Sequence, residues 1–243
     1  MLTSILLVST KMKPKRLFLL SGMGGDARLF QSIGIPEVEI VKPDFIEPAP
    51  GETLSDYALR MAEIQCVKRE DVIGGASFGG MLAAEIALRR PVAGLILLGS
   101  CIHPARLPWS YRWVERFGRF VPDFFLGLQS WRPLIRWRFA PMTPDAEDCM
   151  IAMAADCPSG QLRAFGRMAM GWPGADQIAC PVLSVHGDQD RIIPLSCAEP
   201  GIILKDAGHA FTLTHAEQTN STIEEFLSAR ANHALQPPRA WRN

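Results

Sequence analysis

The sequence predicts an α/β protein built on a mostly parallel sheet with helices on both faces. Six short runs rich in Val, Ile and Leu have the pattern of strands. They are continuous rather than alternating, as expected for strands that are buried on both faces. Helical patterns lie between several of these runs, and repeated strand-helix units imply parallel strands joined by right-handed crossovers. The strand runs cover residues 16–22, 38–44, 71–77, 92–100, 181–188 and 201–208.

Three segments predict the helices of this sheet. Residues 53–65 place apolar side chains on one helical face, and Thr53 stands at the position of an N-cap. Residues 79–90 form a second helix that Pro91 stops, because proline lacks the backbone N–H and clashes with the preceding turn. Residues 215–230 form a third. A chain of 243 residues is long enough to bury one sizeable core.

Charge and cysteine content narrow the classes of partner and compartment. Lys plus Arg number 25 against 25 Asp plus Glu, which gives a net charge of zero. A nucleic-acid binder normally carries a basic patch and a high pI, so a neutral or apolar small-molecule ligand is expected instead. The six cysteines form no C-x-x-C pair and are expected to be free thiols, which favours a cytoplasmic location. The first apolar run is too short for a membrane span, and its basic residues follow it, the wrong order for a signal peptide.

One long segment interrupts the strand-helix rhythm. Residues 104–175 hold twelve of the twenty aromatic side chains and show broken helical patterns without strands. Such a long connection between core strands predicts a helical lid, with a plain helical subdomain on the sheet edge as the alternative. The domains are therefore expected to be a core of 16–103 and 176–232, this lid, an N-terminal arm of 1–15 and an irregular tail of 233–243.

The strongest chemical motif is the pentapeptide from Gly75 to Gly79, with Ser77 at its centre. It follows a predicted strand and opens a predicted helix, which is the context of a nucleophile elbow, G-x-S-x-G. Small residues allow a tight turn that lifts the serine hydroxyl above the sheet. The alternative is a glycine-rich turn in which Ser77 is only an N-cap.

A serine nucleophile needs a histidine to take its proton and a carboxylate to orient that histidine. Asp190 follows the strand at 181–188, and His209 follows the strand at 201–208. Both come just after strand carboxyl ends, where open α/β sheets place their active sites. Asp188, in the same loop as Asp190, is the competing carboxylate.

In these features the sequence resembles the α/β-hydrolase superfamily over about residues 16 to 230. The elbow, the G-x-x-D loop and the late Gly-His pair occur in the family's order, and the lid lies at its usual insertion point. The resemblance implies an α/β-hydrolase fold in which Ser77 is the nucleophile, His209 the general base and acid, and Asp190 the orienting carboxylate. The family pattern favours Asp190 over Asp188, which is then a loop-capping residue.

The loop after the first strand is expected to complete an oxyanion hole. The resemblance assigns the two donors to the backbone N–H groups of Met23 and Phe78. Family members usually have His-Gly-x-Gly here, whereas this chain has Ser21 in place of the histidine. A backbone donor does not depend on the preceding side chain, so only the packing of the loop is put in doubt. A flexible glycine turn is the alternative.

The same loop also resembles a dinucleotide fingerprint. Gly22, Gly24 and Ala27 have its spacing, and Asp44 lies at the end of the next predicted strand. The segment before Pro36 is too short for the crossover helix, and a nucleotide-dependent oxidoreductase would leave the serine, aspartate and histidine unexplained. This alternative is therefore disfavoured.

Together these patterns predict a serine hydrolase without metal or cofactor that cleaves a small or medium, largely apolar ester or thioester. In the lid, Trp109, Trp113 and Trp131 are expected to bind substrate, while the nine arginines of 104–175 are expected to pair with acids and aromatic rings. His186 has the pattern of a buried structural residue. The same scaffold also serves carbon–carbon bond hydrolases, perhydrolases, lyases and small-molecule receptors, so these stay open, as does the oligomeric state.

Overall fold

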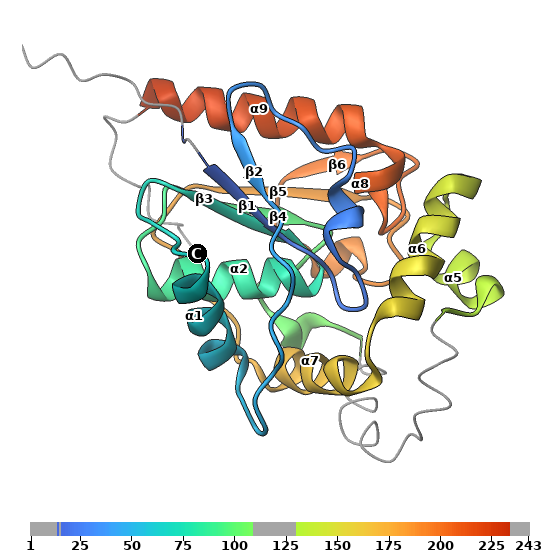
Figure 1. Cartoon of the computed structure of the whole chain (residues 1–243). Coiled ribbons are helices and arrows are strands. Elements are labelled where there is room, and N and C mark those ends of the chain that lie inside the picture. Colours follow the sequence, from blue (N-terminus) through green and yellow to red (C-terminus); the bar gives the residue numbers. More distant parts are fainter. Residues whose placement is uncertain (1–13, 15, 109–129, 234–243) are drawn as a thin grey trace, which may run out of the picture.

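A parallel six-stranded sheet forms the centre of the protein (Figure 1). The computed structural model describes residues 14, 16–108 and 130–233. The strand order is β2-β1-β3-β4-β5-β6, and every neighbouring pair is parallel. All six predicted strands are present. Their bounds are β1 Arg16–Leu20, β2 Glu39–Val41, β3 Val72–Ala76, β4 Gly94–Leu98, β5 Val182–Gly187 and β6 Ile202–Leu204.

Helices cover both faces of this sheet, as the continuous apolar strands predict (Figure 1). The side chains of β1 alternate between two buried clusters: Phe18 and Leu20 face one, and Leu17 and Leu19 the other. Helices α1 Leu54–Ile64 and α2 Phe78–Arg89 lie over the first face, and α9 Ala216–His233 lies over the second. The protein therefore has three layers, with the sheet between two layers of helices, and its fold is of the α/β class.

Local sequence explains where α1 begins. The Thr53 side chain accepts a hydrogen bond from the Asp56 backbone N–H, so it caps the helix as predicted. Leu54, Tyr57 and Met61 form the buried stripe. The Tyr57 hydroxyl donates to the Ile46 carbonyl at 2.8 Å, which satisfies the one polar atom of this buried side chain.

Three helices are described between β4 and β5: α5 Arg132–Phe139, α6 Pro144–Asp156 and α7 Ser159–Gly171. Helix α7 packs under α1 and α2, and the ring of its Phe165 stacks on Phe78 with centroids 4.6 Å apart. Helices α5 and α6 lie on the other side of the sheet edge (Figure 1). The connections contain the short segments η1 Ala27–Phe30, η2 Pro104–Arg106, η4 Leu195–Cys197 and α8 Phe211–Thr214.

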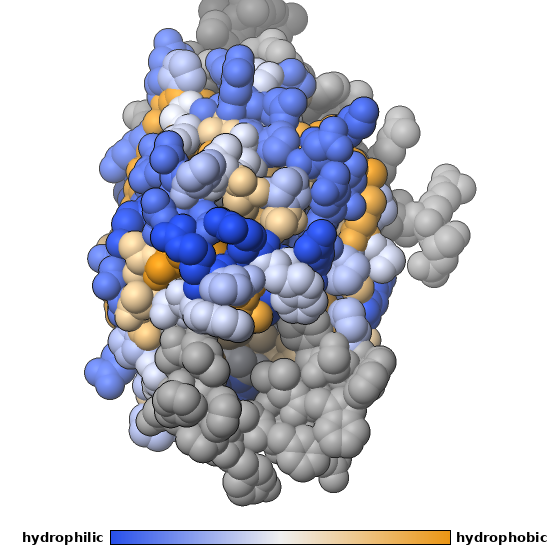
Figure 2. Space-filling view, turned by 90° about the vertical axis from the view of Figure 1, so that its right-hand side faces the viewer, coloured by the Kyte–Doolittle hydropathy of each residue, from blue (hydrophilic) through white to orange (hydrophobic). Residues whose placement is uncertain are grey.

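The surface on the side of α5 and α6 is mostly hydrophilic, with scattered apolar side chains (Figure 2). Among the described residues, none of the helices is both long enough and apolar enough to cross a membrane. All six cysteines are free thiols, as predicted.

Candidate active site

Ser77 lies in a strained turn between β3 and α2. Its φ of 52° and ψ of −118° are values that residues with a side chain rarely adopt. Two glycines make the turn possible. A Cβ atom on Gly75 or Gly79 would lie within 3.0 Å of backbone atoms, including the Leu20 carbonyl in both cases. The pentapeptide therefore has the structural context of a nucleophile elbow, strand-turn-helix.

Neighbouring strands hold this turn in place. The Ser77 backbone N–H donates to the Leu98 carbonyl at the end of β4, at 3.0 Å. The Ser100 hydroxyl donates to the Ser77 carbonyl at 2.7 Å. A Cβ on Gly80 would collide with the Ser100 side chain, so glycine is needed there as well. These contacts fix the backbone of Ser77 and offset the cost of its strained dihedral angles.

His209 and Asp190 meet at the carboxyl end of the sheet. The distance from His209 Nδ1 to Asp190 Oδ2 is 2.6 Å, and both side chains are largely buried. Asp190 Oδ1 accepts the backbone N–H groups of Ile192 and Ile193 at 2.8 and 2.9 Å. Asp188 instead accepts the Ala207 N–H at 3.2 Å, so it closes the loop and does not bind His209 in this arrangement.

The electrostatics of this site keep Asp190 ionised. Burial alone would raise the pKa of Asp190, but the charge of His209 and hydrogen bonds from His186 and His209 hold that pKa well below its ordinary value. A carboxylate that accepts several N–H groups is stabilised in its charged form. Asp190 can therefore fix the orientation of the His209 ring with its Nε2 atom directed away.

His186 contacts the same carboxylate, a link that sequence reasoning missed. Its Nε2 lies 2.7 Å from the Ile193 carbonyl and 3.2 Å from Asp190 Oδ2. A carbonyl only accepts, so this nitrogen carries the hydrogen, and the buried Nδ1 has no partner among the described residues. The four-residue spacing within the H-G-x-x-D loop was the available signal, but only the turn that folds this loop back makes the contact.

The loop that contains Met23 is ordered by its own hydrogen bonds. The Gly25 backbone N–H donates to the Gly22 carbonyl at 3.0 Å, which closes a tight turn. The Ser21 hydroxyl donates to the Gly25 carbonyl at 3.0 Å, so the serine that replaces the family's histidine has a packing role of its own. Ser77 lies directly beside the loop: a Cβ atom on Gly22 would be only 3.4 Å from the Ser77 Cβ, which is close packing.

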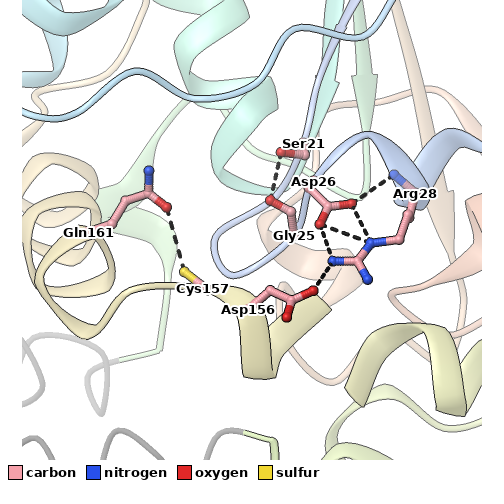
Figure 3. A network of polar contacts seen from close by, with 7 residues as sticks. All are labelled: Ser21, Gly25, Asp26, Arg28, Asp156, Cys157 and Gln161. Carbon is pink, nitrogen blue, oxygen red and sulfur yellow. Dashed lines mark hydrogen bonds and ion pairs between the residues drawn. The ribbon is translucent and has the colours of Figure 1, made fainter. Parts of the chain in front are cut away.

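An ionic contact connects this loop to α6 (Figure 3). The Asp26 carboxylate caps η1 by accepting the Arg28 backbone N–H at 2.9 Å, and it also pairs with the Arg28 guanidinium. The same guanidinium donates to Asp156 at the end of α6, at 2.6 Å. Next to Asp156, the Cys157 thiol donates to Gln161 of α7 at 3.6 Å. Segments more than 100 residues apart are thus joined beside Met23.

A cavity of about 210 Å³ opens at this edge of the sheet. Ser77, Met23, Phe78 and His209 all line it, so the structure brings these four predicted residues to one place. Asp190 lies behind His209. Helices α5, α6 and α7 supply about half of the remaining wall, and their share is apolar apart from one arginine: Ile135, Arg138, Phe139, Met150, Met153, Ala154, Leu162, Ala169 and Met170.

The predicted tryptophan contacts fare differently. Trp109 and Trp113 lie outside the described residues. Trp131 is 57% exposed and is not among the residues that line the cavity. Trp131 precedes the first turn of α5, and its backbone is extended. Its side chain therefore does not lie on the helical face from which Ile135, Arg138 and Phe139 line the cavity.

Comparison with known proteins agrees with this architecture. Residues 17–222 match the model of the alpha/beta hydrolase family. The chain belongs to the alpha/beta hydrolase family. Members of this family place a nucleophile on the turn after a central strand, and Ser77 occupies that place here.

Two curated relatives are similar to this chain over about four fifths of their own length. A pimeloyl-[acyl-carrier protein] methyl ester esterase from Aromatoleum aromaticum is 28% identical over 209 residues, which is 74% of this chain and 82% of the relative. An esterase of the same name from Methylococcus capsulatus is 27% identical over 209 residues, 72% of this chain and 79% of the relative.

Solved structures share the alpha/beta hydrolase fold. A thermophilic esterase from Thermogutta terrifontis superposes with a TM-score of 0.71 at 22% identity, covering 89% of this chain and 90% of that one. A hydrolase from Oleispira antarctica has a TM-score of 0.70 at 12% identity, with coverages of 88% and 91%. Within 16–108 and 130–233, no three His, Cys, Asp or Glu side chains are grouped so as to hold a metal ion.

Proposed function

We propose that this chain is a serine hydrolase that cleaves a small or medium, largely apolar ester or thioester through an acyl-enzyme. The chain is a carboxylic ester hydrolase, since it belongs to the alpha/beta hydrolase family and both curated relatives are esterases. The observation that supports a serine mechanism is the 2.6 Å contact between His209 and Asp190 at a cavity that Ser77 also lines.

The proposed reaction uses groups of this chain alone. His209 takes the proton of the Ser77 hydroxyl as the oxygen attacks the acyl carbon, and Asp190 stabilises the imidazolium that forms. His209 then gives this proton to the leaving alcohol or thiol, which leaves the acyl group on Ser77. A water molecule next loses its proton to His209 and attacks the acyl carbon. The proton returns to Ser77 and the acid is released.

The backbone N–H groups of Met23 and Phe78 are proposed to stabilise the negative oxygen of each tetrahedral intermediate. Phe78 follows the nucleophile at the first position of α2, so its N–H is one of the helix's unpaired donors. Met23 lies in the turn beside Ser77. Each such donor typically contributes about 100- to 1000-fold to kcat.

The segment of residues 104–175 is proposed to act as the lid that selects the substrate. Its described helices supply about half of the apolar cavity wall, and an apolar wall favours an apolar chain and excludes water. The curated relatives are methyl ester esterases, which supports a small alcohol as the leaving group here.

Replacing Ser77 by alanine tests this proposal. The wild type is expected to hydrolyse p-nitrophenyl acetate and butyrate, and Ser77→Ala is expected to lower kcat by at least about 1000-fold. Ser221→Ala, at an exposed position on α9, makes the same chemical change away from the cavity and should keep full activity. Hydrolysis by Ser77→Ala at the wild-type rate would refute the assignment.

A further inference from the structure

One charged side chain departs from the apolar character of the cavity wall. Arg138 on α5 lines the cavity and is half-buried. It is the only Arg, Lys, Asp or Glu among the described residues that line it. The next residue, Phe139, lies close to the reaction centre, because its ring centroid is 5.8 Å from that of His209. The cation therefore belongs to the same chamber as the proposed nucleophile.

Arg138 differs from its neighbours on the same helix. Arg132 and Arg136 both donate to the buried Glu147, at 2.7 and 2.8 Å, and Arg132 also pairs with Asp148. These two arginines form the pairs with local acids that the sequence predicts. In contrast, Arg138 makes no hydrogen bond or ion pair with any residue that the structure describes. Helix α5 thus presents two arginines that are paired with acids and one that has no polar partner among the described residues.

A guanidinium in apolar surroundings needs a counter-charge. It does not deprotonate in proteins, and partial burial removes part of its hydration. Its five N–H donors form a planar fork that fits the two oxygens of a carboxylate. With no acid of the described chain in this role, a carboxylate on the bound substrate is the group that complements it.

We propose that Arg138 forms an anion subsite and that the substrates include monoesters of dicarboxylic acids. The free carboxylate would pair with Arg138, the methylene chain would lie along Ile135, Met150 and Met153, and the ester would lie at Ser77. This inference rests on the proposed function, because it assigns the far end of a substrate whose reacting end is at Ser77. It adds a charge requirement that an apolar cavity alone would not impose.

The competing explanation is a snorkelling arginine. In that case the methylene groups of Arg138 would cover apolar wall while the guanidinium stays in water. A snorkelling side chain would give no preference for a charged substrate, so the charge of the substrate separates the two explanations.

The test uses matched substrates that differ only at the far end. Monomethyl esters of C5 to C8 dicarboxylic acids are compared with the half-amides of the same esters, because a primary amide has nearly the shape of a carboxylate without its charge. The wild type is expected to prefer the carboxylate by about 10- to 100-fold in kcat/KM, the range for hydrogen bonds to a charged group. In Arg138→Gln this ratio should fall to near one, and high salt should reduce it in the wild type.

Arg167→Gln provides the matched control. Arg167 is exposed on α7, does not line the cavity, and its replacement changes the net charge by the same amount. This variant should keep the wild-type ratio, and thermal unfolding should show that both variants are folded. A wild-type ratio near one, or an unchanged ratio in Arg138→Gln, would overturn the subsite.

A binding measurement separates failure of the subsite from failure of the proposed function. The dissociation constants of the monomethyl ester and its half-amide are measured calorimetrically on Ser77→Ala, which cannot turn them over under the proposed mechanism. If neutral esters are cleaved with Ser77 but charge has no effect, the function stands and the subsite falls. If no ester is cleaved, the function falls and the binding ratio alone decides the subsite, with about tenfold tighter carboxylate binding as the supporting result.

Discussion

The same substitution, glycine to alanine, should have opposite effects on stability at Gly79 in the serine turn and at Gly166 in α7. A Cβ on Gly79 would lie within 3.0 Å of the Leu20 and Ser21 carbonyls, which are backbone atoms and cannot rotate away. Overpacking of this kind costs about 1 to 3 kcal/mol, and fixed obstacles place Gly79→Ala near the upper value. Since 1 kcal/mol corresponds to about 2 to 4 °C for a chain of this size, the melting temperature should fall by about 6 to 12 °C.

The same substitution at Gly166 should have the opposite sign. Gly166 lies inside α7, and a Cβ there meets nothing within 4 Å. Alanine is favoured over glycine inside a helix by about 1 kcal/mol, so Gly166→Ala should raise the melting temperature by about 2 to 4 °C.

Activity separates the two substitutions further. Gly79→Ala pushes the turn of Ser77 away from the Met23 loop, and a displacement of about 1 Å at a reacting group costs on the order of 100-fold. Gly166→Ala should keep wild-type kcat. The measurements are thermal denaturation by circular dichroism and ester hydrolysis on the same preparations. If Gly79→Ala were as stable and as active as the wild type, the close packing of the turn against β1 would not be what positions the serine.

Three further predictions concern the polar groups around the site. His186→Leu removes an N–H donor from Asp190, so the free energy of unfolding should fall by about 1 to 3 kcal/mol and kcat by about tenfold. His186→Gln keeps a donor, so denaturant titrations and kinetics should show smaller losses of stability and kcat. Equal losses in the two variants would contradict a role for the donor. Asp156→Asn breaks an exposed ion pair, so stability should change by less than about 1 kcal/mol, and any loss in kcat/KM should disappear at high salt; a larger, salt-independent loss would contradict this. Folding lowers the pKa of Asp190, so its ionisation stabilises the protein above the unfolded pKa of about 3.8, and this contribution disappears as the pH falls through the lower folded pKa. In acid titrations, the stability advantage of wild type over Asp190→Asn should therefore be constant above about pH 5 and shrink below about pH 4. A difference that stays constant at all pH values would refute this sign.

The core of the fold could be predicted from sequence because its signals are local and repeated. Continuous apolar runs specify strands buried on both faces, and Thr53 marks the start of α1 by a cap that depends on its immediate neighbours. The helix positions within the segment 104–175 are harder to predict from the sequence. Its helices are set by where they pack, and the burial of Phe165 against Phe78 depends on residues almost 90 positions apart.

The site divides in the same way. Ser77, Asp190 and His209 stand next to strand ends, so topology alone brings them to one edge. The contact of His186 with Asp190, and the lack of a polar partner for Arg138 among the described residues, depend on side-chain directions that periodicity does not give. Trp131 shows the same limit. The sequence predicts that it binds substrate, but it lies one position before α5 in an extended conformation, and its side chain is exposed to solvent.

The central claim is that Ser77 is the nucleophile, and covalent labelling tests it most directly. A fluorophosphonate reacts with an activated serine and leaves a phosphonyl group on its oxygen. After labelling, proteolysis and mass spectrometry, the adduct is predicted on the peptide that contains Ser77, and Ser77→Ala should carry none. An adduct on another residue, or equal labelling of Ser77→Ala, would contradict the account.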